Sequence, residues 1–60
     1  MKLVDSETVA GHTVSVERDG GTFYVLVAVN NKPPQRLYTG SQAGARTFFA
    51  GVIAGLTLMG

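Results

Sequence analysis

The sequence contains no cysteine and no tryptophan, and it contains a single histidine, His12. Without cysteine the chain has neither a disulfide bond nor a thiolate metal site. One histidine also excludes a histidine-based metal centre within a single chain, so we expect no metal and no cofactor. Proteins without disulfides are typical of reducing compartments, which favours a cytoplasmic location.

The chain offers little material for a core, because it holds only 60 residues and 6.3 kDa. We expect one domain that spans residues 1–60. Folding buries only about 60% of the surface that an unfolded chain of this size exposes, so stability is marginal. Small domains usually gain stability from disulfides, a metal or a partner subunit, and the first two are excluded here. Oligomerisation is therefore the expected source of stability.

Acidic residues are absent beyond Asp19. All four acids lie in residues 1–19, whereas residues 20–60 carry three basic residues and no acid. This asymmetry predicts that an anion binds in the middle of the chain. Five basic residues in total are too few for an extended nucleic-acid surface, so we expect no such partner.

Side chains with catalytic potential are also few. His12 has no serine or cysteine nearby in a recognised nucleophile context. Asp5 and Glu7 are two residues apart and share one face of an extended segment, as paired acid–base or cation-binding carboxylates do. Their place near the start of the chain favours a solvated strand edge instead. We therefore expect no catalytic residues and no enzyme.

Three or four strands are expected ahead of one helix, as β-β-β-α or β-β-β-β-α. Residues 13–18 (TVSVER) alternate valine with polar side chains, which predicts a half-buried strand, and residues 2–8 add a fourth strand if one begins at Leu3 and Val4. Asp19-Gly20-Gly21 supplies the positive φ angles of a tight hairpin. Residues 22–30 (TFYVLVAVN) are apolar on both faces, which predicts a central strand that needs cover on each side. Residues 36–39 form a short strand after a two-proline loop at 30–35.

The last twenty residues, 41–60 (SQAGARTFFAGVIAGLTLMG), predict a helix that Ser41 caps and that ends near Leu58. One side carries an apolar stripe that should pack on the sheet: Ala45, Phe48, Phe49, Val52, Ile53 and Leu56. The only charge is Arg46. The other side carries small uncharged residues: Thr47, Ala50, Gly51, Ala54, Gly55 and Thr57. Small residues let another backbone approach closely, so this side predicts a homo-oligomer interface.

A membrane span is an alternative for the same segment, because Gly51 and Gly55 have the GxxxG spacing of membrane helix pairs. The uncharged run from residue 47 to residue 60 has 14 residues. As a helix it measures about 21 Å, whereas a bilayer core is about 30 Å thick. We therefore keep a single-span membrane peptide only as a second alternative.

The strongest candidate for a ligand site is the segment 36–46 (RLYTGSQAGAR), a strand, a glycine turn and a helix start. Free N–H groups and the helix dipole attract anions at such a start. We expect two arginines to clamp a phosphate, hydroxyls to bind it and a tyrosine to stack on a base. The residues of this site are Arg36, Tyr38, Thr39, Gly40, Ser41 and Arg46. An ordinary capped helix whose glycines serve packing is the alternative.

With these residues, and with a short sheet before one helix of small residues, the chain resembles the small phage-encoded proteins that block bacterial defence. Among them the type that sequesters cyclic nucleotides is similar in style. The resemblance implies a compact homo-oligomer in the host cytoplasm that holds its ligand between subunits.

These observations predict a non-enzymatic homo-oligomeric binding protein that sequesters a phosphate-bearing small molecule such as a cyclic nucleotide. The alternative is a protein–protein inhibitor or assembly subunit that uses the apolar helix or strand surface against another protein, such as a host protein. The two differ in what they bind, because an inhibitor of this kind would ignore nucleotides.

Overall fold

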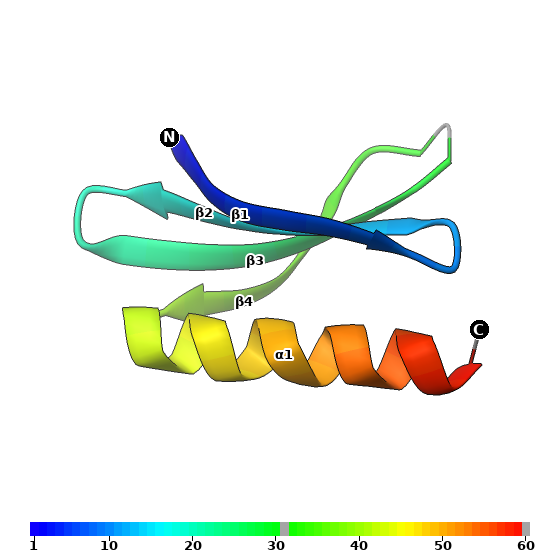
Figure 1. Ribbon diagram of the computed structural model, residues 1–60. Helices are drawn as coiled ribbons and strands as arrows, with labels where there is room; N and C mark the ends of the chain where they lie inside the picture. The colour runs from blue at the N-terminus through cyan, green and yellow to red at the C-terminus, as the bar shows by residue number, and fades with distance from the viewer. Residues whose placement is uncertain (31, 60) are drawn as a thin grey trace.

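The chain forms a four-stranded antiparallel sheet followed by one α-helix (Figure 1) in a computed structural model that describes residues 1–30 and 32–59. The strands follow one another in the order β1-β2-β3-β4, each paired with the next. The α+β class and the four-strand alternative are therefore confirmed. The elements are β1 Lys2–Val9, β2 His12–Asp19, β3 Thr22–Val29, β4 Gln35–Gly40 and α1 Gln42–Met59.

Two-residue turns join the first three strands. In the β2–β3 turn Asp19 pairs with Thr22, so the loop consists of Gly20 and Gly21, with Gly20 at φ 62°. The predicted hairpin is confirmed, with Asp19 ending the strand rather than lying in the loop. The β1–β2 turn consists of Ala10 and Gly11, both at positive φ as a type I′ turn requires. Ala10 adopts φ 52° although it has a Cβ atom, which disfavours that conformation.

The element bounds differ from the predictions at strand ends. β1 covers Lys2–Val9, and the short strand predicted at 36–39 extends over Gln35–Gly40. Gln35 therefore belongs to a strand rather than to the predicted loop at 30–35, of which residue 31 lies outside the described residues. The helix continues one residue past Leu58, to Met59.

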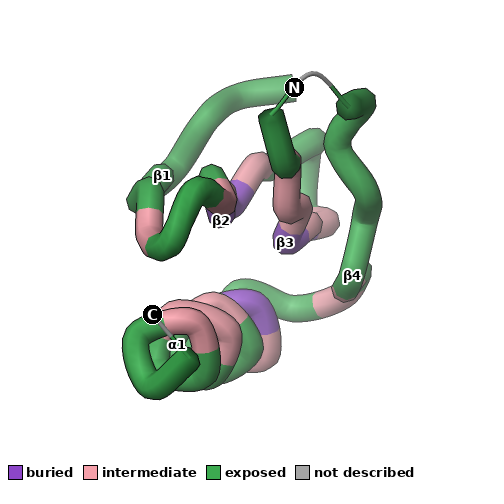
Figure 2. The backbone as a smooth tube through the Cα atoms, turned by 90° about the vertical axis from the view of Figure 1, so that its right-hand side faces the viewer, coloured by how far each residue is buried: buried purple, intermediate pink, exposed green. Residues whose placement is uncertain are grey.

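Helix α1 covers one face of the sheet, and the small core lies between the two layers (Figures 1 and 2). Apolar side chains of the two central strands and of the first turns of the helix are buried there because alternation directs every second strand residue to that face. The buried residues are Val14, Val16, Phe23, Val25 and Ala45. Partly buried side chains complete the layer: Val27, Tyr38, Phe49, Val52, Ile53 and Leu56.

Phe48 departs from the predicted apolar stripe. Its side chain is 38% exposed rather than buried in the core. Instead it stacks on Tyr38 at the edge of the helix–sheet layer, with 5.6 Å between the ring centroids. The stripe predicted from spacing is therefore one residue narrower than expected.

The face of the sheet that points away from the helix, here called the open face, carries the second apolar row of β3. Tyr24, Leu26 and Ala28 are only partly buried there, and no helix or strand of the described chain lies over them. Figure 2 shows that the sheet curls, so that the starts of β1 and β4 rise on the side away from α1.

Both edge strands are irregular. The pairing of β1 with β2 shifts register between Leu3 and Asp5. The pairing of β4 with β3 shifts register between Val25 and Leu26, so that Leu37 is an extra residue on β4. Pro33 and Pro34 precede β4. Bulges and prolines hinder the addition of a further strand to a sheet edge. The regular surfaces left for contact are therefore the open face and the outer side of α1.

Candidate functional site

The predicted ligand segment joins β4 to α1, and its turn is built as a helix cap. The Gly44 N–H donates to Ser41 Oγ over 3.2 Å, and the Ala45 N–H donates to the Ser41 carbonyl over 2.9 Å. Ser41 thus satisfies a first-turn donor that would otherwise need water or a ligand. The predicted capping role of Ser41 is confirmed.

Gly40 and Gly44 make room for the ring of Tyr38. A Cβ atom at Gly40 would lie 2.6 Å from Tyr38 Oη, and one at Gly44 would lie 2.8 Å from Tyr38 Cζ and closer still to the hydroxyl. Real Cβ atoms do not approach other atoms this closely. The space beside both glycines is therefore filled by Tyr38, as the packing alternative predicted. Because Phe48 stacks on the same ring, Tyr38 belongs to the helix–sheet layer.

Arg36 lies on the opposite face of the sheet from Tyr38. In a regular strand, residues two apart share a face. Here Tyr38 pairs with the buried Val25, whereas Arg36 pairs with Leu26 of the open face, because the extra residue Leu37 separates them. The bulge therefore moves Arg36 from the helix side to the open face.

On the open face, the guanidinium carbon of Arg36 lies 5.0 Å from the centroid of the Tyr24 ring, within cation–π distance. Thr39 pairs with Tyr24 and is exposed on the same face. Arg36 also borders a hollow of about 320 Å³. The hollow is lined by Met1, Tyr24, Leu26, Pro34 and Arg36.

Arg46 lines a different hollow, of about 200 Å³, between β1 and α1. Its other lining residues are Val4, Asp5, Val16, Phe49 and Ala50. Arg36 and Arg46 thus lie on different sides of the sheet, so they do not converge on one phosphate within a single chain. Ligand binding by either arginine stays a prediction.

Sequence reasoning did not select Tyr24 and Leu26 as site residues. The apolar second face of residues 22–30 was a signal that this side needs a contact, and it was interpreted only as an interface. The bulge that brings Arg36 beside Tyr24 depends on the register with β3, which no local pattern reveals.

The outer side of α1 is exposed along its length. Thr47, Ala50, Gly51, Ala54 and Gly55 are all exposed, and a Cβ atom at either glycine would meet no described atom within 4 Å. The hydroxyl of Thr47 donates to the Ala43 carbonyl over 3.1 Å, and that of Thr57 donates to the Ile53 carbonyl over 2.8 Å. The two hydroxyls are therefore engaged within the helix, and the surface that they present outward is largely methyl groups.

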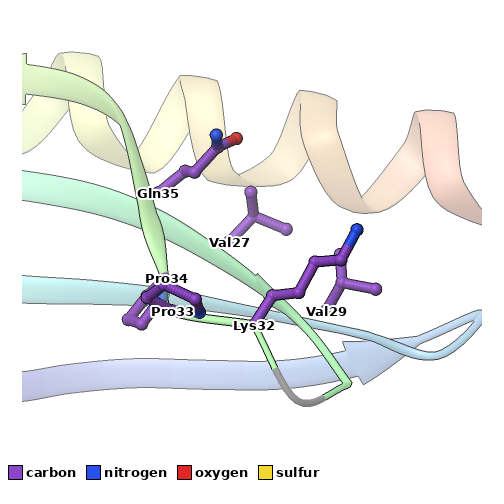
Figure 3. Close-up of a pocket in the computed structure, with 6 residues that line it drawn as sticks. All are labelled: Val27, Val29, Lys32, Pro33, Pro34 and Gln35. Carbon is purple, nitrogen blue, oxygen red and sulfur yellow. The ribbon is translucent and has the colours of Figure 1, made fainter.

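Another hollow lies where β4 separates from β3 (Figure 3) and measures about 380 Å³. Val27 and Val29 line it from β3, and the side chains of Lys32 and Gln35 extend along it. Pro33 and Pro34 complete the lining. Two valines, two prolines, one amine and one amide offer neither a nucleophile with a base nor a carboxylate pair.

The other titratable candidates have local contacts. His12 Nδ1 lies 2.9 Å from the Ala10 carbonyl oxygen in the β1–β2 turn. Asp5 Oδ1 accepts a hydrogen bond from the Ser6 N–H over 2.8 Å. Over residues 1–30 and 32–59, no three side chains of His, Cys, Asp or Glu are gathered as a metal ion would need.

No protein-family model, curated protein or solved structure matches the chain. The resemblance to phage anti-defence proteins therefore stays a prediction. Within the described residues, α1 is not both long and apolar enough to cross a membrane.

Proposed function

We propose that the chain is a non-enzymatic binding protein that works as a homo-oligomer, with the outer side of α1 as its self-association surface. One observation carries the proposal: an 18-residue helix packs on the sheet along one side only, and its exposed remainder contains a single charged residue, Arg46. A helix of a monomeric protein normally presents charged side chains to water. The near absence of charge here is typical of a helix with a second protein contact.

The exposed residues opposite the sheet form a seam along the helix. We define the seam as Ala43, Thr47, Ala50, Gly51, Ala54 and Leu58, all of which are exposed. Their spacing of three, four and seven residues places them in one line on a helix. The two ends of this line differ in size: Ala43 in the first turn is small, whereas Leu58 in the last turn is large and 89% exposed.

A second copy in antiparallel orientation complements this difference in size between the two ends. When the midpoints of the two helices coincide, Ala43 lies level with Leu58 of the partner subunit, and Thr47 with Ala54 of the partner subunit. Ala50 then lies level with Gly51 of the partner subunit. Each end of the contact then joins one alanine to one leucine, and the middle joins small residues, so no level joins two large side chains over about 22 Å of helix.

A parallel pair of helices does not match residue sizes in this way. It places leucine against leucine at one end and alanine against alanine at the other, so the helices diverge or leave a gap. Gaps and overpacking both lower stability in a protein contact. Size complementarity therefore favours the antiparallel arrangement, which is the self-complementary contact of a two-fold dimer.

Cysteine cross-linking tests this arrangement well, because the chain contains no other cysteine. The variants Thr47→Cys and Ala54→Cys are mixed and oxidised mildly. In the antiparallel pair the two different variants bring their Cα atoms within the reach of a disulfide, about 4.4–6.8 Å. Two copies of the same variant are offset by about 10 Å along the axis and should not cross-link.

The expected result is therefore a disulfide between unlike variants and little between like variants. Cross-links between like variants would show a parallel pair and reject the antiparallel arrangement. A Ser6→Cys variant on the opposite face of the sheet reports random collisions. Sedimentation of the unmodified protein as a monomer at micromolar concentration would reject self-association itself.

The alternative function, binding of a different protein, uses the same outer side of α1. The substitution Ala54→Glu, which places a charge in the seam, distinguishes this alternative from self-association. If self-association holds, this variant sediments as a monomer while the unmodified chain sediments as a dimer. If the surface serves another protein, the two chains sediment alike.

A further inference from the structure

We infer that the hollow on the open face binds a small organic anion, with Arg36 holding its oxyanion group and the apolar wall holding its body. The hollow lies on the side of the sheet away from α1, so this inference does not depend on helix pairing. It is carried by the placement of the Arg36 guanidinium beside the nonpolar side chains of Tyr24 and Leu26, over which no helix or strand of the described chain lies.

Arg36 is available to an anion. No hydrogen bond or ion pair to another side chain engages its guanidinium among the described residues, and the contact that holds it is the ring of Tyr24. A guanidinium has five N–H donors in one plane, which match a carboxylate or phosphate in bidentate fashion. A cation–π contact directs the group without using an anionic partner.

The bulge at Leu37 is what places this cation here. Without it, Arg36 would share the face of Tyr38, beside the helix–sheet layer, and the open face would lose its arginine. An edge-strand bulge that redirects one side chain is a common device at binding sites.

The remaining lining is apolar and comes from three separate parts of the chain. Leu26 belongs to β3, Pro34 precedes β4, and Met1 precedes β1. Figure 2 shows that the curl of the sheet brings the starts of β1 and β4 onto the same side of β3. The combination of one cation with an apolar wall selects a ligand that carries both an oxyanion and an apolar body.

Charge on the open face limits where the anion lies. Glu17 pairs with Tyr24 and shares its face, on the β2 side. Asp5 and Glu7 pair with the buried Val16 and Val14, so they belong to the opposite face. An anion is therefore favoured on the β4 side of Tyr24, at Arg36, and disfavoured on the β2 side.

Phenyl phosphate and benzoate are suitable probes, because they share an oxyanion on a flat apolar body and differ in the kind of oxyanion. A ligand of about ten heavy atoms in a shallow hollow binds in the millimolar range. Titration followed by amide chemical shifts should move the signals of Tyr24, Leu26 and Arg36. Inorganic phosphate and phenol each supply one half of the probe and should bind at least tenfold more weakly.

The matched variants are Arg36→Ala and Arg46→Ala, which remove the same charge from two different hollows. We expect Arg36→Ala to weaken probe binding more than tenfold and Arg46→Ala to change it less than twofold. Equal losses in both variants would mean nonspecific attraction and overturn the inference. It is also overturned if inorganic phosphate binds as well as phenyl phosphate, or if no signal on the open face moves.

The monomer expected from Ala54→Glu separates this inference from the proposed function. If the hollow binds the probe, this variant binds it with unchanged affinity, because residue 54 lies on the far side of α1. Loss of binding in Ala54→Glu would show that the site needs the dimer and would reject a site built within one chain.

Discussion

Two glycines of α1 should respond in opposite directions to the same substitution. Gly44 lies in the first turn against the ring of Tyr38, whereas a Cβ atom at Gly55 meets no described atom within 4 Å. Gly55 lies on the outer side of α1 but is not one of the six seam residues, so the substitution leaves the seam itself unchanged. Gly55→Ala is therefore a matched control for Gly44→Ala.

The expected changes in the free energy of unfolding follow from helix propensity and from packing. Alanine is favoured over glycine by about 0.8–1.0 kcal/mol inside a helix. Gly55→Ala should therefore raise the free energy of unfolding by about that amount. At Gly44 the new methyl group overlaps Tyr38, and overpacking of this kind costs about 1–3 kcal/mol. The first turn gains less from propensity, so Gly44→Ala should lower the free energy of unfolding by about 1–2 kcal/mol.

Thermal unfolding measures both changes, with circular dichroism at one fixed protein concentration because self-association raises the midpoint. In a domain of this size 1 kcal/mol corresponds to about 4–8 °C. Gly55→Ala should unfold at a higher temperature than the unmodified chain, and Gly44→Ala at a lower one.

The contact itself is tested by removing the hydroxyl of Tyr38, the atom nearest to the new methyl group. Tyr38→Phe alone should change stability by less than about 0.5 kcal/mol, since the hydroxyl makes no hydrogen bond among the described residues. In that background Gly44→Ala should cost about 1 kcal/mol less than in the unmodified chain. An increase in midpoint for Gly44→Ala would refute the placement of Tyr38 between the glycines.

Two further substitutions test the turn and the core. Ala10→Asn should raise the free energy of unfolding by about 0.5–1 kcal/mol, because Ala10 adopts φ 52° in a type I′ turn and asparagine tolerates that conformation better than alanine. Urea unfolding measures this change, and a loss of stability would contradict the type I′ turn. Val14→Ala should lower the free energy of unfolding by about 2–3 kcal/mol, because Val14 is fully buried and loses two methyl groups in a core of five buried residues. A change under about 0.5 kcal/mol in the same urea experiment would mean that the core does not lie at Val14.

Much of this fold could be predicted because its local signals agree. Alternation in β2 and the glycine pair after Asp19 both specify a hairpin, and the helix stripe specifies the face that packs on it. β1 was harder to predict because it contributes no fully buried side chain, so it lacks a clear alternation of polar and apolar residues. Such an edge strand is specified by pairing with β2 rather than by its own sequence.

The candidate site was less predictable because the rule that residues two apart share a face of a strand does not hold there. From spacing, Arg36 and Tyr38 share a face, and a single bulged residue at Leu37 separates them. Bulges depend on how two strands align, so the sequence of one strand does not locate them. The aromatic neighbour of Arg36 is consequently Tyr24 rather than Tyr38, and Tyr24 lines the hollow on the open face.

The glycines show most clearly why composition alone does not assign a role. Gly40 was predicted as a residue of the ligand site, and the ring of Tyr38 fills the space beside both Gly40 and Gly44 instead. Gly51 and Gly55 have the same chemistry, yet a Cβ atom at either would have no described atom within 4 Å beyond the neighbouring helix backbone. A glycine inside a helix costs about 1 kcal/mol relative to alanine, and at Gly44 the fit of Tyr38 compensates for that cost. At Gly51 no contact with the described residues compensates for it, and this is the position that the proposed antiparallel pair would place level with Ala50 of the partner subunit.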